Sequence, residues 1–184
     1  MIRRIDDPTV LLPAAQRLGW KATGRGRPGT PIGDTLTLLE EAKRLGLVER
    51  LDWSFRCLAF DVATTAGMAG ELHLTPEPET FGSACPPRLA VSFLRGRRAL
   101  AVVAELHADA FRDERLLRTA VDQMRSWGWQ FAYCDVSGTG AERHAIELLE
   151  VVRPAYQHVD LSITGSPALY QAAVATGATL LAVH

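Results

Sequence analysis

The sequence predicts an α/β fold in which parallel strands alternate with helices, as in a (β/α) barrel or a doubly wound sheet. Short runs rich in Val, Leu, Ile and aromatic residues recur between helical patterns along most of the chain. The run at residues 100–106 is almost continuously apolar, which is typical of a strand buried on both faces of a sheet. With 184 residues, the chain has the length of one domain, residues 1–184.

The expected strands are bounded by glycine, proline or charged turn residues. They lie at residues 18–23, 71–75, 100–106, 130–135, 157–163 and 179–183, with a further strand at residues 3–10. Because helices separate them, we expect parallel strands joined by right-handed crossovers.

Helical patterns lie between these strands, at residues 34–42, 52–66, 114–127, 143–152 and 166–176. The first begins at Asp34, whose side chain can cap a helix, and its pattern ends at Gly46. The second has large apolar residues at three- and four-residue spacing. The third stops at Gly128, and the fourth stops before Pro154. The fifth begins with Ser166 and a proline, the favoured order of cap and first helical residue.

Charge and cysteine content exclude several classes of protein. Lys and Arg number 20 against 21 Asp and Glu, so the net charge of −1 excludes a generally basic nucleic-acid-binding surface. We interpret the basic residues 95–98 as a solubilising turn and the sequence RGRP at residues 25–28 as part of a surface loop. The three cysteines lack CxxC spacing, which predicts a reducing, cytoplasmic setting. No apolar run reaches the length of a membrane span, so neither nucleic acid nor membrane is an expected partner.

Polar and ionisable residues gather at the carboxyl ends of the expected strands. In parallel α/β folds, ligands bind at that edge of the sheet, because the loops that follow the strands converge there. The sequence therefore predicts a binding face that contains Lys21, Thr75, Glu105, His107, Cys134, Asp135, His158 and Asp160.

Several segments match known motifs in chain order. The segment GWKATGR at residues 19–25 is similar to Gly-Tyr-Glu-Ala-Leu-x-Arg, and VAELH at residues 103–107 is similar to a strand with Glu-Leu-Thr-Glu. Cys134 and Asp135 stand where a pair of aspartates is expected, and residues 153–160 resemble Arg-Pro…Lys-x-Asp. Further matches lie at residues 7–8, 72–80 and 177–182. Together they make the chain resemble the EAL-domain cyclic di-GMP phosphodiesterases, which implies a TIM-like (β/α) barrel of the EAL type, here truncated after the seventh strand.

The chain departs from that family mainly at the residues that would carry the chemistry. The resemblance implies two divalent cations, Mg²⁺ or Mn²⁺, held by carboxylates and an asparagine. Five positions are altered. Lys21 replaces a glutamate, Thr75 the asparagine and Cys134 an aspartate. His158 replaces a lysine, and Val183 replaces a final glutamate. Glu105 and Asp135 remain, with Asp160 beside them. A lysine among so few carboxylates disfavours a hard cation, so we expect Mg²⁺ or Mn²⁺ binding, and with it hydrolysis, to be lost.

The resemblance implies a catalytically inactive regulatory module of bacterial cyclic di-GMP signalling, acting as a nucleotide receptor or through protein–protein interaction. Arg25 matches the arginine that contacts the nucleotide phosphate in the family, a task that suits a guanidinium. The candidate ligand-binding residues are Lys21, Arg25, Thr75, Glu105, Asp135, His158 and Asp160. Two alternatives stay open: a pure interaction or dimerisation module without nucleotide binding, and a residual metal-dependent cyclic di-GMP phosphodiesterase.

Two other roles are open to the strand-end residues. Lys21 is expected to offset the charge of Glu105 or Asp135 in place of a bound cation. Glu105, Cys134, Asp135 and His158 are also competent zinc ligands, which His107 and His184 could join. Because these residues lack CxxC or HxxxH spacing, the sequence favours hydrogen-bonded core groups over a zinc site.

The number of expected strands also bears on assembly. A barrel of this type has eight strands, and the sequence predicts only seven. A missing strand leaves two sheet edges with unpaired backbone groups, which proteins usually cover. We therefore expect a homodimer or another protein partner to cover the open edge.

Overall fold

The computed structural model describes residues 2–6, 17–107, 113–134, 146, 149–160 and 167–183. Within them, one sheet contains seven strands in chain order: β1 (Ile2–Asp6), β2 (Arg17–Ala22), β3 (Glu71–Leu74), β4 (Ala101–His107), β5 (Gln130–Cys134), β6 (Tyr156–Asp160) and β7 (Thr179–Val183). From β2 to β7, each strand is parallel to its neighbour. This confirms the predicted α/β class with a parallel sheet.

The first strand differs from the prediction, because β1 is antiparallel to β2. The interval between Asp6 and Arg17 explains the difference. Parallel neighbours need a crossover of a dozen or more residues, and this interval is shorter. Residues 7–10 of the expected strand lie outside the described residues, as do residues 161–163 of the sixth.

Helices follow most of the strands: α1 (Thr35–Arg44), α2 (Val48–Thr65), α3 (Ala90–Ala99), α4 (Glu114–Ser126) and α6 (Pro167–Ala175). Two short 3-10 turns, η1 (Pro78–Thr80) and η2 (Pro87–Leu89), precede α3. As predicted, the Asp34 carboxylate caps α1, accepting a hydrogen bond of 2.9 Å from the backbone N–H of Thr37. Residues 149–152 are helical, in agreement with the end of the predicted helix 143–152; most of its earlier residues lie outside the described ones.

Two helices differ from the sequence-based expectation. Helix α2 begins at Val48, not near residue 52, and buries Val48 in its first turn. The predicted basic turn at residues 95–98 is wrong, because these residues lie within α3. Gly96 faces Phe60 so closely that an added Cβ would lie 2.3 Å from the ring, so the small residue permits α2 and α3 to pack.

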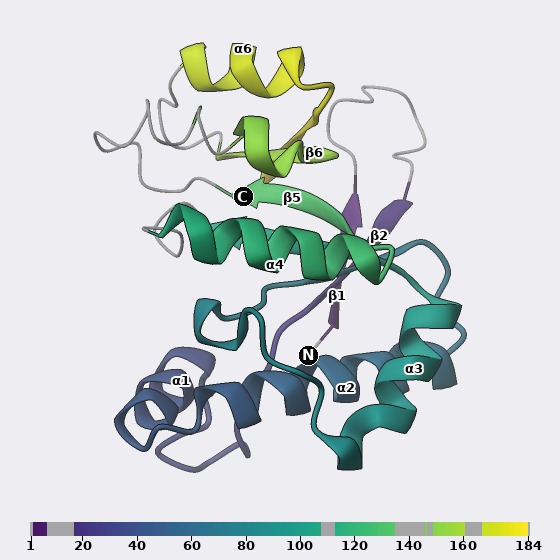
Figure 1. Ribbon diagram of the computed structural model, residues 1–184. Coiled ribbons are helices and arrows are strands. Elements are labelled where there is room, and N and C mark those ends of the chain that lie inside the picture. Colours follow the sequence, from purple (N-terminus) through teal and green to yellow (C-terminus); the bar gives the residue numbers. More distant parts are fainter. Residues whose placement is uncertain are drawn as a thin grey trace.

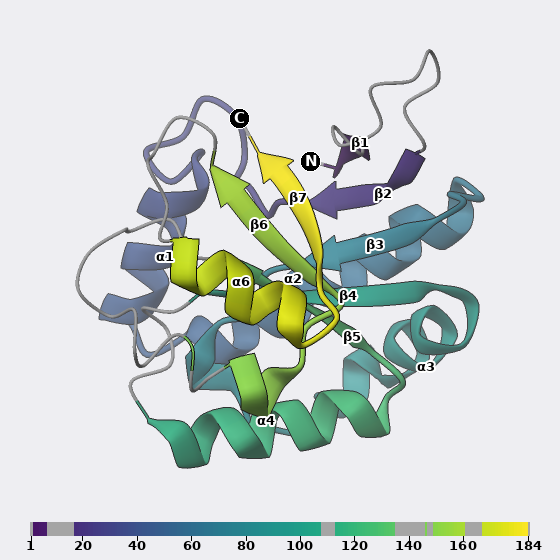
Figure 2. The ribbon, with the colours of Figure 1, turned by 90° about the horizontal axis from the view of Figure 1, so that it is seen from above.

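The sheet is curled into a half-barrel, with helices on its outer side (Figure 2). Strands β3 and β6 are three positions apart in the sheet, which in a flat sheet would separate them by about 14 Å. Instead, the Tyr156 hydroxyl of β6 donates a hydrogen bond of 3.0 Å to Glu71 of β3. The rings of His73 and His158 stack across the same space, with centroids 6.4 Å apart. The concave face therefore brings together residues from strands that are not neighbours.

The main apolar core lies between the convex face of the sheet and helices α2, α3 and α4 (Figure 1). Trp53 is fully buried and packs edge-to-face against Phe93 and Trp127, at ring-centroid distances of 5.4 and 5.9 Å. Trp127 and Trp129 also pack edge-to-face, at 5.0 Å, at the corner between α4 and β5.

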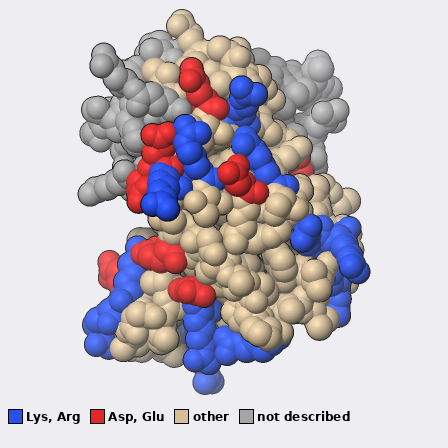
Figure 3. Space-filling model, in the orientation of Figure 1, with Lys and Arg blue, Asp and Glu red and all other residues tan. Residues whose placement is uncertain are grey.

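None of the helices in the described part of the chain combines the length and the hydropathy that a membrane span requires. Acidic and basic side chains intermingle over α4 (Figure 3), in keeping with the net charge of −1. Basic side chains gather at one side of the same view, over α3, where Arg95, Arg97 and Arg98 are exposed.

Candidate functional site

Three predicted site residues meet at the carboxyl ends of β2, β3 and β4. Glu105 is fully buried, and its Oε2 atom pairs with the ammonium of Lys21. The Thr75 hydroxyl donates to the same oxygen at 3.2 Å. The pairing with Glu105 confirms one of the two partners expected for Lys21; the other, Asp135, lies outside the described residues.

The surroundings of Glu105 keep its carboxylate ionised despite its burial. Burial by itself favours the neutral acid, but contacts with His73, Lys21 and His158 outweigh it and hold the pKa of Glu105 well below its usual value. A permanent negative charge therefore lies inside the half-barrel, compensated by the residues around it.

His73 is a member of this cluster that the sequence-based reasoning missed. Its Nδ1 atom lies 3.4 Å from Glu105 Oε1, and its Nε2 atom lies 3.6 Å from Glu71 Oε2. Burial lowers the pKa of His73, yet the two carboxylates outweigh burial, so the net shift is upward. Strand alternation could have identified it, because Glu71, His73 and Thr75 occupy alternate positions and so share one face.

His158 and Cys134, from β6 and β5, form the other side of the cluster. The Cys134 Sγ and His158 Nδ1 atoms are 3.1 Å apart, and His158 Nε2 lies 3.9 Å from Glu105 Oε1. Burial, followed by the positive charge of Lys21, lowers the pKa of His158 to about 4, so its imidazole is neutral at pH 7. Burial, together with the charge of Glu105, raises the pKa of Cys134 well above its usual value and keeps it a thiol.

A pocket of about 620 Å³ opens above this cluster, between the loop after β2 and helices α1 and α2. Lys21, Arg25 and Thr75 line it together, so three predicted site residues share one cavity. Much of the remaining wall is apolar and includes Leu36 and Phe55. Glu105, Cys134 and His158 are not among its lining residues. The sequence predicts one shared binding face for the strand-end residues. In the structure, Lys21 and Thr75 line the pocket, whereas Glu105, Cys134 and His158 are buried beside it.

Arg25 differs from the other cations in the pocket wall. Lys21 is paired with Glu105, and Arg56 is paired with Asp52. Arg25 is exposed and makes no ion pair or hydrogen bond within the described part of the chain. Its guanidinium is therefore available for an anionic ligand.

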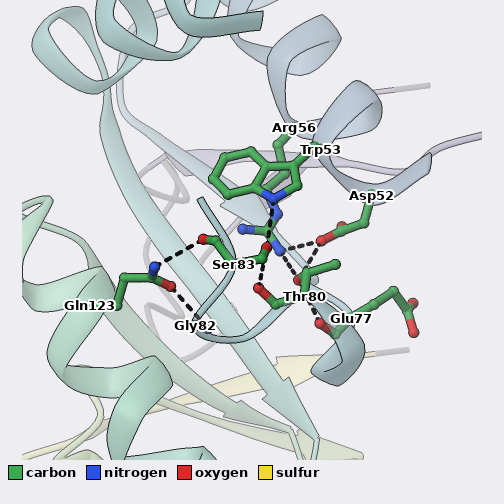
Figure 4. Close-up of polar contacts among 8 residues, drawn as sticks. All are labelled: Asp52, Trp53, Arg56, Glu77, Thr80, Gly82, Ser83 and Gln123. Carbon is green, nitrogen blue, oxygen red and sulfur yellow. Dashed lines mark hydrogen bonds and ion pairs between the residues drawn. The ribbon is translucent and has the colours of Figure 1, made fainter. Parts of the chain in front are cut away.

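A buried polar network, which sequence reasoning did not find (Figure 4), includes Asp52 and Arg56, which also line the pocket. Arg56 pairs with Asp52 on α2 and donates to the Thr80 hydroxyl of η1, while its guanidinium lies 4.7 Å from the Trp53 ring centroid. The Trp53 indole donates to Ser83 Oγ at 2.8 Å, and Gln123 of α4 donates to the Ser83 carbonyl at 3.0 Å. These bonds fix the segment after β3 against α2 and α4, which makes one wall of the pocket rigid.

The described residues fit a pair of hard cations poorly. Of the positions at which the family resemblance implies ligands, Lys21, Thr75, Cys134 and His158 offer no carboxylate. Glu105 offers one, but the Lys21 ammonium is already bound to it. Asp135 lies outside the described residues, and so does the side chain of Asp160, although its backbone ends β6. Mg²⁺ prefers several oxygen ligands, which this part of the site lacks.

The fold of this chain was compared with those of known proteins. No protein-family model and no curated protein matches the sequence. Among solved structures, the chain is similar to the phosphodiesterase PaMucR in complex with c-di-GMP, with a TM-score of 0.68 and 17% identity over 99% of this chain and 79% of that one. It is also similar to the Xanthomonas citri FimX EAL domain in complex with c-diGMP, with a TM-score of 0.67 and 13% identity. That match covers 98% of this chain and 74% of the FimX chain.

A third similar structure is the Vibrio cholerae LapD S helix-GGDEF-EAL protein in its apo form, with a TM-score of 0.71 and 11% identity. The match covers 99% of this chain but 47% of the LapD chain, which includes other segments. These comparisons confirm the predicted resemblance to EAL domains and the half-barrel fold, and at such low identity the likeness is one of fold.

Proposed function

We propose that this protein is a catalytically inactive EAL-like regulatory module that binds cyclic di-GMP without cleaving it. The observation that carries the proposal is the pocket lined by Lys21, Arg25 and Thr75, in which Arg25 is available for a phosphate. Support also comes from the fold, because the similar structures of PaMucR and FimX are complexes with this nucleotide. We further propose that the protein acts in the cytoplasm.

The pocket suits a nucleotide in both size and composition. Its volume of about 620 Å³ lies within the usual range for small-molecule sites. A guanidinium at the mouth can contact two phosphate oxygens, and apolar side chains such as Leu36 and Phe55 can cover a base. This recognition needs no metal ion, so it is compatible with the poor fit of the site to Mg²⁺.

The contacts of Glu105 disfavour metal-dependent hydrolysis. Its Oε2 atom, which a cation would otherwise contact, is occupied by Lys21 and Thr75. The half-buried Lys21 ammonium at this position repels a further cation and offsets the charge of the carboxylate. We therefore expect no metal-dependent phosphodiester cleavage.

Calorimetry with cyclic di-GMP tests the proposal, with and without Mn²⁺. We expect saturable binding in both conditions, weakened at least tenfold by Arg25→Ala, because a charge-assisted contact contributes about 1.5–3 kcal/mol. Arg27→Ala is the matched control: Arg27 is exposed on the same loop but does not line the pocket. Absence of saturable binding, or equal weakening by both variants, would reject the receptor function.

An activity assay separates the receptor from the residual phosphodiesterase. The protein is incubated with cyclic di-GMP and Mn²⁺, and the linear product is measured by chromatography. Product formation above the blank that disappears in Glu105→Ala would show an enzyme and overturn our assignment.

A second candidate function, a protein-interaction module, is favoured by exposed apolar side chains on the helices. Leu36 of α1 is 73% exposed, Leu58 of α2 is 60% exposed and Val91 of α3 is 70% exposed. In this case a second copy or another protein would cover such residues or the edges of the sheet, where β1 and β7 are the outermost strands. Light scattering tests self-association: a dimer supports this function, whereas a monomer that binds cyclic di-GMP supports the receptor.

A further inference from the structure

Three buried side chains converge inside the half-barrel with atoms that can bind a metal. His73 of β3 and Glu105 of β4 are fully buried, and His158 of β6 is 8% exposed. One donor atom from each residue lies within 4.8 Å of the donor atoms of the other two. We propose that His73, Glu105 and His158 bind a transition-metal ion of the Zn²⁺ type, at a site distinct from the pocket lined by Arg25.

The distances between the donor atoms are close to those of a metal site. Glu105 Oε1 lies 3.4 Å from His73 Nδ1 and 3.9 Å from His158 Nε2. In a tetrahedral zinc site with metal–ligand distances of about 2.0–2.1 Å, neighbouring ligand atoms are about 3.3 Å apart. The largest of the three separations is at most 4.8 Å, so side-chain rotations that shorten it would bring all three atoms into contact with one ion.

The same three atoms lack hydrogen-bond partners within the described part of the chain. They are Glu105 Oε1, His73 Nδ1 and His158 Nε2, all of them inaccessible to solvent. The other carboxylate oxygen of Glu105 is different, because Lys21 and Thr75 both donate to it. Both imidazoles already interact electrostatically with Glu105, but none of the three atoms makes a hydrogen bond, and a shared metal ion would bind all three.

Neighbouring residues lie beside the outer nitrogen of each imidazole. On His73, the nitrogen that points away from the cluster lies 3.6 Å from Glu71 Oε2, beyond hydrogen-bond range, and the other oxygen of Glu71 accepts a hydrogen bond of 3.0 Å from Tyr156. On His158, the outer nitrogen lies 3.1 Å from the sulfur of Cys134. Metal-binding histidines commonly donate their second ring N–H to a carboxylate or a similar acceptor, which leaves the other nitrogen free for the ion.

The donor atoms of the three residues favour a transition-metal ion over Mg²⁺. Two imidazoles and one carboxylate form a ligand set typical of Zn²⁺ and other first-row transition metals, whereas Mg²⁺ prefers oxygen alone. The carboxylates of Glu71 and Glu105 supply negative charge to the site. Lys21 opposes the ion, because its ammonium is bound to the other oxygen of Glu105.

A metal titration tests the site on the full chain, freed of metal by a chelator and then dialysed. We expect calorimetry to show one Zn²⁺ bound per chain. The affinity for Zn²⁺ should be lower by at least about 100-fold in His73→Gln and in His158→Gln, because substitution even of residues that only contact a metal ligand commonly lowers affinity by about 10- to 100-fold. We expect Lys21→Met to bind Zn²⁺ more tightly than the original chain, because a repelling charge is removed.

His107→Gln is the discriminating variant, because Glu105, His107 and Cys134 form a second group of possible ligands. Our proposal requires that Zn²⁺ affinity be unchanged in His107→Gln. Unchanged affinity in His73→Gln, or loss of binding in His107→Gln alone, would overturn it.

X-ray absorption on the zinc-loaded original chain provides a test that does not depend on the folding of any variant. We expect nitrogen and oxygen ligands at about 2.0 Å, with the outer-shell signal of two imidazoles. A sulfur ligand at about 2.3 Å would show that Cys134 binds the ion in place of the proposed set, and a site without imidazole would also reject it.

Discussion

The two faces of the curled sheet differ sharply in their chemistry. On the convex face, apolar side chains such as Leu72, Ala104 and Phe131 pack against the helices in a continuous core. On the concave face, the strand positions between them carry Glu71, His73 and Glu105. Successive side chains of a strand point to opposite faces of the sheet, so the same short strands supply both the apolar and the ionisable residues.

This difference separates stability from function in the molecule. Burying aromatic and aliphatic surface stabilises the fold, whereas burying charge is unfavourable unless every group has a partner. The concave face nevertheless contains buried ionisable groups, and such groups are common at functional sites. Substitutions on the two faces should therefore have different consequences, and the following predictions test this in order of decreasing effect.

The largest effect is expected on the convex side, from Trp53→Ala. This change removes a fully buried ring, its edge-to-face contacts and its hydrogen bond to Ser83. We expect a loss of about 5 kcal/mol in the free energy of unfolding, the upper end for an aromatic residue in a core. Urea unfolding followed by circular dichroism measures it, and Leu36→Ala, at a site that is 73% exposed, serves as the control. Similar losses in the two variants would contradict our description of the core.

The next effect is expected on the concave side, from Lys21→Met in the absence of metal. The change leaves the buried Glu105 carboxylate without its ammonium partner. We expect a loss of about 3–4 kcal/mol at pH 7, because removal of one member of a buried pair leaves an uncompensated charge. The double variant Lys21→Met/Glu105→Gln should regain part of this loss, since the uncompensated charge at residue 105 is then removed. A double variant less stable than the single one would show that Glu105 is compensated in another way.

The elements that pack on the convex face were the easiest to predict from the sequence. The periodicity of apolar residues predicted the parallel strands and most helices, because the convex core requires it. Helix α3 escaped prediction, because Gly96 and its neighbouring arginines are typical of a turn and only the packing on Phe60 reveals the helix. The antiparallel β1 was missed because strand character alone does not indicate direction.

Prediction of the site was limited in a similar way. The family resemblance identified Lys21, Thr75 and Glu105, which the structure brings together. His73 lies within the matched segment 72–80 but was not among the expected site residues, and its contact with His158 depends on the curl of the sheet, which joins strands far apart in sequence. Such contacts depend on sheet curvature, so linear spacing does not reveal them.

The third prediction concerns pH and distinguishes the two buried histidines, with metal removed by a chelator. Burial lowers the pKa of His158 from its ordinary value of 6.5 to about 4, so between these values the unfolded chain binds the proton and the folded chain does not. His158 therefore contributes stability that is complete above pH 6.5 and is lost as the pH falls to 4, on the order of 3 kcal/mol. In His158→Gln, urea unfolding should show a weaker loss of stability over this range.

His73 provides the matched control, because the pKa shift has the opposite sign. Its pKa is raised in the folded state, so its contribution is complete below pH 6.5 and is lost as the pH rises through the folded value. His73→Gln should therefore change the stability profile above pH 6.5, and it should change the slope between pH 4 and 6.5 less than His158→Gln does. Identical profiles for both variants would contradict the arrangement of charges around Glu105.

The smallest effect is expected at the outer surface, where charge is solvated. Glu114 and Arg118 form an ion pair of 2.6 Å along α4, with side chains that are 58% and 57% exposed. Water and salt screen such a pair, so Arg118→Ala should change the free energy of unfolding by no more than about 0.5 kcal/mol. Urea unfolding at low and high salt measures this, beside Lys21→Met, whose larger effect should persist in high salt because Glu105 is buried. A loss in Arg118→Ala as large as that in Lys21→Met would mean that burial does not govern the strength of these ion pairs.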